Sequence, residues 1–87
     1  MKLILAIVRD SDSDLVTQAL TSSHFRVTRI ASTGGLLRRG VTTLMVGVED
    51  AQVDSAIQLM RDQTSPAGGG EKRATVFVVD VEKFMQV

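Results

Sequence analysis

The sequence predicts an α+β fold in which strands and helices follow one another in the order βαββαβ. Short apolar runs rich in β-branched residues are typical of strands, and the segments between them have apolar residues at helical spacing. A weak internal repeat supports this order, because the pattern Val8, Asp10, Asp14, Gln18 recurs as Val48, Asp50, Asp54, Gln58. With right-handed crossovers, the two halves form one ferredoxin-like antiparallel sheet with two helices on one face.

The strands are expected at residues 3–8, 25–32, 42–48 and 74–79. Asp10 or Ser11 is expected to cap the first helix, which ends near Ser22, and Asp50 to cap the second. Each helix has an apolar stripe, which comprises Leu15, Val16, Ala19 and Leu20 in the first and Val53, Ala56, Ile57 and Met60 in the second. Residues 65–70, SPAGGG, end the second helix, and a helical turn carrying Phe84 is expected in the tail.

Length and composition limit the function classes open to this chain. Its 87 residues make one small domain, 1–87, and the absence of cysteine excludes disulfides and thiolate metal sites. A net charge of zero argues against a dedicated nucleic-acid or membrane-surface binder. The apolar run at 3–8 is shorter than a signal-peptide core or a membrane span, so a soluble, cytoplasmic protein is expected.

Three of the predicted strands are apolar on both faces. In the first, Leu3, Leu5 and Ile7 alternate with Ile4, Ala6 and Val8, and the strands at 42–48 and 74–79 repeat the pattern. Two helices can cover only one face of a sheet, and soluble monomers rarely leave so large an apolar face in water. The sequence therefore predicts self-association through the open sheet face.

The segment Thr33–Gly40 joins the second and third strands and combines glycines with two adjacent arginines, Arg38 and Arg39. Gly34 and Gly35 allow backbone N–H groups to turn toward an anion, and arginine matches phosphate oxygens. A hairpin loop that needs positive φ is the other interpretation of the glycines. Leu36 and Leu37 are apolar loop residues, which indicates packing against a base or a neighbouring subunit.

Arg26 and Thr28 point to the same side of the second strand and could bind a phosphate or the edge of a base. The alternative is an edge strand with ordinary polar residues, and Arg29 and Ser32 are expected to be surface residues. Gly47 interrupts the third strand, where glycine marks either close approach of a ligand or a bulge or tight packing.

Catalysis and metal binding find no support in the sequence. His24 is the only histidine and has no companion ligands at metal-binding spacing, and no cofactor is expected. The cluster Asp10, Asp12 and Asp14 lacks the glycine and terminal glutamate of a calcium loop. No catalytic triad, Walker or zinc pattern appears, and the arginine-bearing glycine loop of acylphosphatases is missing. A protein that is not an enzyme is expected.

The chain resembles the PII-like cyclic-di-AMP receptors over nearly its whole length. The resemblance is carried by FRVT at 25–28, ASTGGLL at 31–37, GVTT at 40–43 and GV at 47–48, with MKLILAIVRDSDSD and ATVFV similar to the first and last strands. It implies a homotrimer that binds cyclic-di-AMP between subunits and signals to a downstream protein. The ligand positions that it implies are His24, Arg26, Thr28, Gly34, Gly35, Leu36, Leu37, Val41 and Gly47.

Five departures from the family pattern leave two functions open. Val41 replaces an asparagine, Leu36 replaces a phenylalanine, His24 replaces an asparagine, and the second loop between Ser65 and Ala74 is much shortened. Residues 71–73, EKR, also stand where the family has glycines. The first hypothesis is a signalling protein for cyclic-di-AMP or another adenine nucleotide. The alternative is a ligand-free PII-like module that acts through protein contacts.

Overall fold

Four antiparallel strands form one sheet in the spatial order β2-β3-β1-β4. The computed structural model describes residues 1–30, 40–64 and 74–87. Along the chain the elements are β1 (Lys2–Arg9), α1 (Asp10–Ser22), β2 (Arg26–Ile30), β3 (Val41–Val48), the 3-10 turn η2 (Asp50–Gln52), α2 (Val53–Gln63) and β4 (Ala74–Asp80). The predicted α+β fold with a ferredoxin-like βαββαβ order is confirmed.

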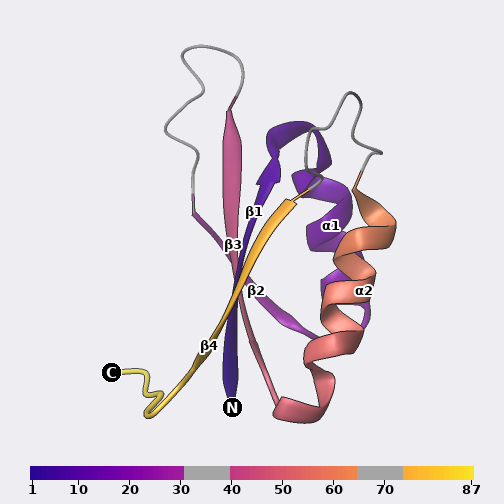
Figure 1. Cartoon of the computed structure of the whole chain (residues 1–87). Coiled ribbons are helices and arrows are strands. Elements are labelled where there is room, and N and C mark those ends of the chain that lie inside the picture. Colours follow the sequence, from indigo (N-terminus) through magenta and orange to yellow (C-terminus); the bar gives the residue numbers. More distant parts are fainter. Residues whose placement is uncertain (31–39, 65–73) are drawn as a thin grey trace.

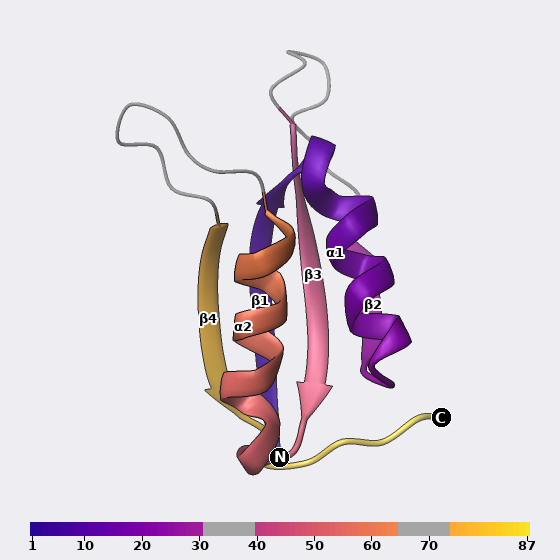
Figure 2. The same cartoon turned by 90° about the vertical axis from the view of Figure 1, so that its right-hand side faces the viewer.

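Both helices lie on one side of the sheet and leave its other side uncovered (Figure 1). From the helix side, α1 lies over β2 and α2 lies over β1, while β4 lies at the edge beyond α2 (Figure 2). No helix in the described part of the chain is long and apolar enough to cross a membrane.

The strand register decides which side chains face the helices. Ile4 on β1 lies opposite Val46 on β3 and Val78 on β4, so these residues and their alternates share the helix side. The buried apolar core combines this side of the sheet with the helices and comprises Ile4, Ala6, Val8, Val16, Leu20, Phe25, Leu44, Val46, Val48, Ala56 and Met60. The edge strand is less well covered, since Val78 is 44% exposed.

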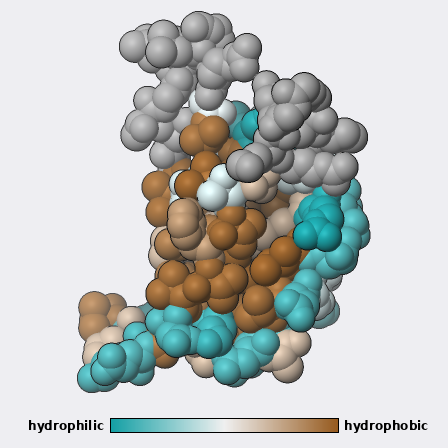
Figure 3. Space-filling view, viewed as in Figure 1, coloured by the Kyte–Doolittle hydropathy of each residue, from teal (hydrophilic) through white to brown (hydrophobic). Residues whose placement is uncertain are grey.

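The open face of the sheet is also apolar, as the sequence predicts. Leu5 lies between Met45 and Phe77 across three strands, and Leu3 lies beside Val79. Phe77 is 53% exposed and Val79 is 44% exposed. In Figure 3, hydrophobic residues gather over the strands, whereas hydrophilic residues cover the outer side of the helices. The single chain therefore leaves large apolar side chains in contact with solvent.

The helix starts differ from the predicted caps. Asp10 is the first residue of α1, follows Arg9 at the cap position, and accepts a hydrogen bond from the Thr42 hydroxyl instead of capping the helix. Glu49, not Asp50, precedes η2, and Glu49 and Gln52 form a reciprocal capping box. Asp50 instead pairs with the N-terminal amine at 3.3 Å. Both cap predictions are wrong because tertiary partners take these carboxylates.

The C-terminal tail forms no helical turn, contrary to the sequence-based expectation. The amide of Val81 donates to the carbonyl of Met1 at 3.1 Å, and residues beyond it have no regular structure. Phe84 is 63% exposed. The tail leaves β4 on the side away from the helices (Figure 1), so its apolar side chains have no packing partner that would favour a helix.

Val46→Asp is expected to abolish folding, because Val46 is fully buried between the sheet and the helices. A buried carboxylate without a partner costs several kcal/mol, a large share of the roughly 5–15 kcal/mol that stabilises a domain. The nearly isosteric control Val46→Thr should keep the fold at a cost of about 1–3 kcal/mol. Circular dichroism with urea unfolding measures both, and a cooperative wild-type-like transition in Val46→Asp would contradict this packing.

Candidate functional site

The predicted ligand residues Arg26 and Thr28 lie on β2, at one edge of the sheet. Arg26 pairs with Gly47 of β3 and Thr28 pairs with Met45, which places both side chains on the open face. Both residues are exposed. The structure therefore brings together a guanidinium, a hydroxyl and a glycine on the face that the helices do not cover.

Gly47 continues the strand without a bulge, since it pairs with Arg26 on one side and Leu3 on the other. A Cβ built on Gly47 would meet no described atom within 4 Å. Tight packing within the chain and a bulge are thus both excluded as reasons for this glycine among the described residues. A strand glycine costs roughly 0.5–1 kcal/mol relative to alanine, and no described atom fills the space beside it.

Val41 lies apart from this group. It is the first residue of β3, pairs with Arg9, and is 43% exposed on the open face. Six residues of strand separate Val41 from Gly47, or about 20 Å at the usual rise. The structure therefore does not bring Val41 beside Arg26. Gly34, Gly35, Leu36 and Leu37, which complete the predicted set, lie outside the described residues.

His24 follows the end of α1 and adopts a left-handed backbone conformation with φ of 71°. Its amide donates to the carbonyl of Thr21 at 3.0 Å, and the next amide, Phe25, donates to Leu20 at 3.0 Å. These bonds close the helix terminus in the manner of an αL cap. Histidine and asparagine are among the non-glycine residues that tolerate this conformation. The left-handed backbone therefore accounts for a histidine at position 24.

A polar network that sequence analysis missed lies at the end of the sheet where α1 begins. Arg29, expected at the surface, contacts Asp14 at 3.0 Å and Ser13 at 3.2 Å. Thr42 is buried and donates to Asp10. Arg9 pairs with the buried carboxylate of Asp12 at 3.3 Å. Strand alternation could have predicted the contact between Arg29 and α1, because Arg29 lies on the helix side of β2 together with Val27.

The opposite end of the sheet carries an exposed ion pair between Lys2 and Asp80. The Asp80 hydrogen bond and charge raise the pKa of Lys2, and the same pair lowers the pKa of Asp80. The contribution of Asp80 to the free energy of unfolding is present above its unfolded pKa and is lost as the pH falls through its lowered folded pKa. The Lys2 contribution is lost as the pH rises through its raised folded value. This exposed pair therefore stabilises the fold across the neutral range. It lies on the helix side of β1 and β4, whereas Arg26 lies on the open face of β2.

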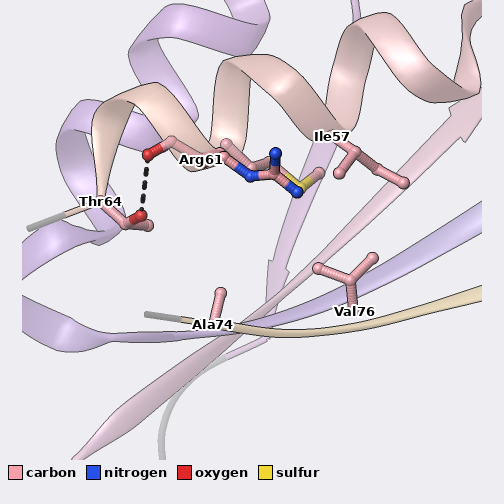
Figure 4. A pocket seen from close by; sticks show the side chains of 6 residues that line it. Ile57, Arg61, Thr64, Ala74 and Val76 are labelled. Carbon is pink, nitrogen blue, oxygen red and sulfur yellow. Dashed lines mark hydrogen bonds between the residues drawn. The ribbon is translucent and has the colours of Figure 1, made fainter. Parts of the chain in front are cut away.

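A pocket of about 270 Å³ lies between α2 and β4, lined by Ile57, Met60, Arg61, Thr64, Ala74 and Val76. The Arg61 side chain extends along the apolar lining, and the Thr64 hydroxyl donates to the Arg61 carbonyl at 3.1 Å (Figure 4). Because β4 and β2 are opposite edges of the sheet, this pocket is separate from the Arg26 group. Within the described ranges, no cluster of three or more metal-ligating side chains occurs.

The protein is thus a small α+β domain that carries Arg26, Thr28 and Gly47 on its open sheet face. The described residues show no arrangement of side chains typical of a catalytic site. The family model described as cyclic-di-AMP receptor matches residues 1–69. The chain therefore belongs to the cyclic-di-AMP receptor family, a signalling family and not a family of enzymes.

A solved structure of a protein of unknown function from Pediococcus pentosaceus ATCC 25745 has a similar fold. The two chains share 29% sequence identity with a TM-score of 0.79, over 99% of this chain and 96% of that one. The similarity extends over β4 and the tail, beyond the residues that the family model matches.

Gly47→Ala is expected to raise the free energy of unfolding by roughly 0.4–1 kcal/mol, because the added methyl meets no described atom and stiffens the unfolded chain. Urea denaturation of the two proteins at equal concentration measures the difference. If Gly47→Ala instead lowered stability by more than 1 kcal/mol, the free space would be occupied by a second copy of the chain.

Proposed function

We propose that this protein is a signalling receptor that binds cyclic-di-AMP, or another adenine nucleotide, between the subunits of a homotrimer. The observation that carries the proposal is the pairing of Arg26 with Gly47 on the open sheet face, inside the matched family region. An exposed guanidinium beside a position without a side chain suits a bulky anionic ligand. Family membership supplies the class of ligand.

Arg26 and Thr28 are suited to two different groups of one ligand. Residues two apart on the same face of a strand lie about 7 Å from each other. The Arg26 guanidinium binds a phosphate through its forked donors, and the Thr28 hydroxyl donates to or accepts from a base edge or a second phosphate oxygen. Their exposure leaves both available to a molecule that approaches the open face.

Assembly completes this binding face. Large apolar side chains on the open face, including Phe77 and Val79, lie on the same side of the sheet as Arg26. Packing copies of the chain against one another removes this apolar area from water. PII-like proteins form homotrimers, so three copies would bury the apolar centre and place the β2 edge at the subunit boundary.

Signalling then follows from the segment that joins β2 and β3. Ligand phosphate, held by Arg26 and by backbone N–H groups of the Gly34–Gly35 region, selects one conformation of residues 33–40. A downstream protein recognises that conformation, and the ligand must favour it by a real difference in affinity. Slower amide exchange in residues 33–40 at saturating nucleotide is the measurement that checks this step.

A ligand-free interaction module is the second candidate function, and Val41 is the observation that favours it. This apolar side chain is 43% exposed at a position where the family carries a polar one. An exposed valine at the loop end of β3 suits protein contact better than the reading of an adenine edge.

Calorimetric titration with cyclic-di-AMP, other cyclic dinucleotides and ATP tests the proposed function. Binding of at least one adenine nucleotide is expected. Arg26→Ala should weaken that binding by about 1.5–3 kcal/mol, the scale of a charge-assisted hydrogen bond, without changing the assembly.

The matched control is Arg61→Ala, which removes an exposed arginine of α2, on the helix side of the sheet, and should leave affinity unchanged. No heat with any nucleotide would refute the receptor function and favour the interaction module. If Arg26→Ala bound with wild-type affinity, Arg26 would not be the residue that binds the phosphate.

Sedimentation equilibrium at micromolar concentration is expected to give the mass of a trimer. Phe77→Asp should shift it toward the monomer, because it places a charge on the open apolar face. Leu15→Asp is the matched control: Leu15 is 55% exposed and Phe77 53% exposed, but Leu15 lies on α1. A monomeric wild type, or equal loss of assembly in both variants, would contradict association through the sheet.

A further inference from the structure

The first turn of α1 is bonded to the start of β3. The Asp10 amide donates to the carbonyl of Gly40 at 3.2 Å. The Thr42 hydroxyl donates to the Asp10 carboxylate at 2.5 Å. One residue of the helix thus holds β3 through both its backbone and its side chain, just where the chain returns from residues 31–39.

The same helical turn is bonded to the end of β2. Arg29 donates to the Ser13 hydroxyl at 3.2 Å and pairs with Asp14 at 3.0 Å. Ser13 in turn donates to the Asp10 carbonyl at 3.0 Å. The path from Thr42 through Asp10 and Ser13 to Arg29 is therefore continuous and joins the two strands that flank residues 31–39.

The strand register shows why this connection matters. The described part of the ladder between β2 and β3 reaches the pair Ile30 and Thr43. Val41 and Thr42 precede Thr43 on β3 and pair with Arg9 and Val8 of β1. The hydrogen bonds from α1 reach Arg29 and Thr42, which precede the two members of this pair, and so tie both strands to the helix at this end of the sheet.

The buried side chains of this network, Thr42 and Ser13, hold the strands to α1 more strongly than its exposed ion pair does. Thr42 is 6% exposed and Ser13 is 3% exposed, so water has little access to either hydroxyl, whereas the Asp10 side chain that Thr42 binds is exposed. The Arg29–Asp14 ion pair is more exposed, with 46% and 86% of the side chains accessible. Exposed ion pairs contribute little, so the Thr42–Asp10–Ser13 part is the more sensitive target.

We propose that Asp10, Ser13, Arg29 and Thr42 form a brace that positions the segment between β2 and β3 for nucleotide binding. The brace residues do not touch the ligand; they fix the two ends from which residues 31–39 depart. Fixed ends reduce the conformational freedom that binding must remove. If the brace opens, the binding-competent fraction falls and the apparent affinity falls by the same factor. This inference rests on the proposed receptor function.

Thr42→Val tests the brace because it removes the hydroxyl and keeps the shape. With cyclic-di-AMP as the probe, its Kd should rise roughly three- to tenfold, the effect of losing one hydrogen bond. Thr42→Ser should restore wild-type affinity, and Ser13→Ala should weaken binding in the same direction. Thr64→Val is the matched control, since Thr64 is 5% exposed and its hydroxyl bonds the Arg61 carbonyl at the end of α2. It should lower thermal stability without changing the Kd.

Amide exchange without nucleotide separates the brace from the receptor function. Thr42→Val should speed exchange at residues 29–30 and 40–43, whereas Thr64→Val should not. If wild type binds no nucleotide, the receptor function fails, and unchanged exchange would also overturn the brace. If wild type binds and Thr42→Val binds equally well, the brace is overturned while the function stands. An equal loss of affinity in Thr42→Val and Thr64→Val would reduce the effect to general stability and overturn the positioning role.

Discussion

The constraint on which the rest of the structure depends is that two helices cover only one face of the sheet. β1 is central and pairs with strands on both sides, so its alternate residues must serve two different surfaces. Ile4, Ala6 and Val8 pack under the helices, whereas Leu3, Leu5 and Ile7 face away from them. One strand thus supplies both the core and the open face. The surface that needs covering and the surface that carries Arg26 are consequently the same.

Much of the fold could be predicted because it depends on local periodicity. Strand alternation and helical spacing identify the elements, their order and the two-sided apolar strands. The helix caps could not be predicted, since Asp10 has a capping side chain but Thr42, distant in sequence, binds it instead. The His24 conformation and the unstructured tail also depend on neighbours that a single sequence does not reveal. Local propensity decides whether a segment forms a helix or a strand, and tertiary partners decide how its ends are bonded.

The site was predictable in part for the same reason. Alternation places Arg26 and Thr28 on one face, but only the register shows that Gly47 lies opposite Arg26. Register is a long-range property, which also separates Val41 from this group by most of the length of β3. Gly47 is informative because a Cβ at this position would meet no atom of the described residues.

Asp10 links these observations, because the carboxylate that fails to cap its helix joins α1 to β3. A cap would have stabilised one helix terminus by about 1 kcal/mol. The bond to Thr42 instead couples three elements, since α1 also reaches β2 through Ser13 and Arg29. Val41 lies next to Thr42 on β3, but its side chain is on the open face, on the other side of the sheet from this network. The side chain at position 41 can therefore change without removing any of the bonds that join α1 to β2 and β3.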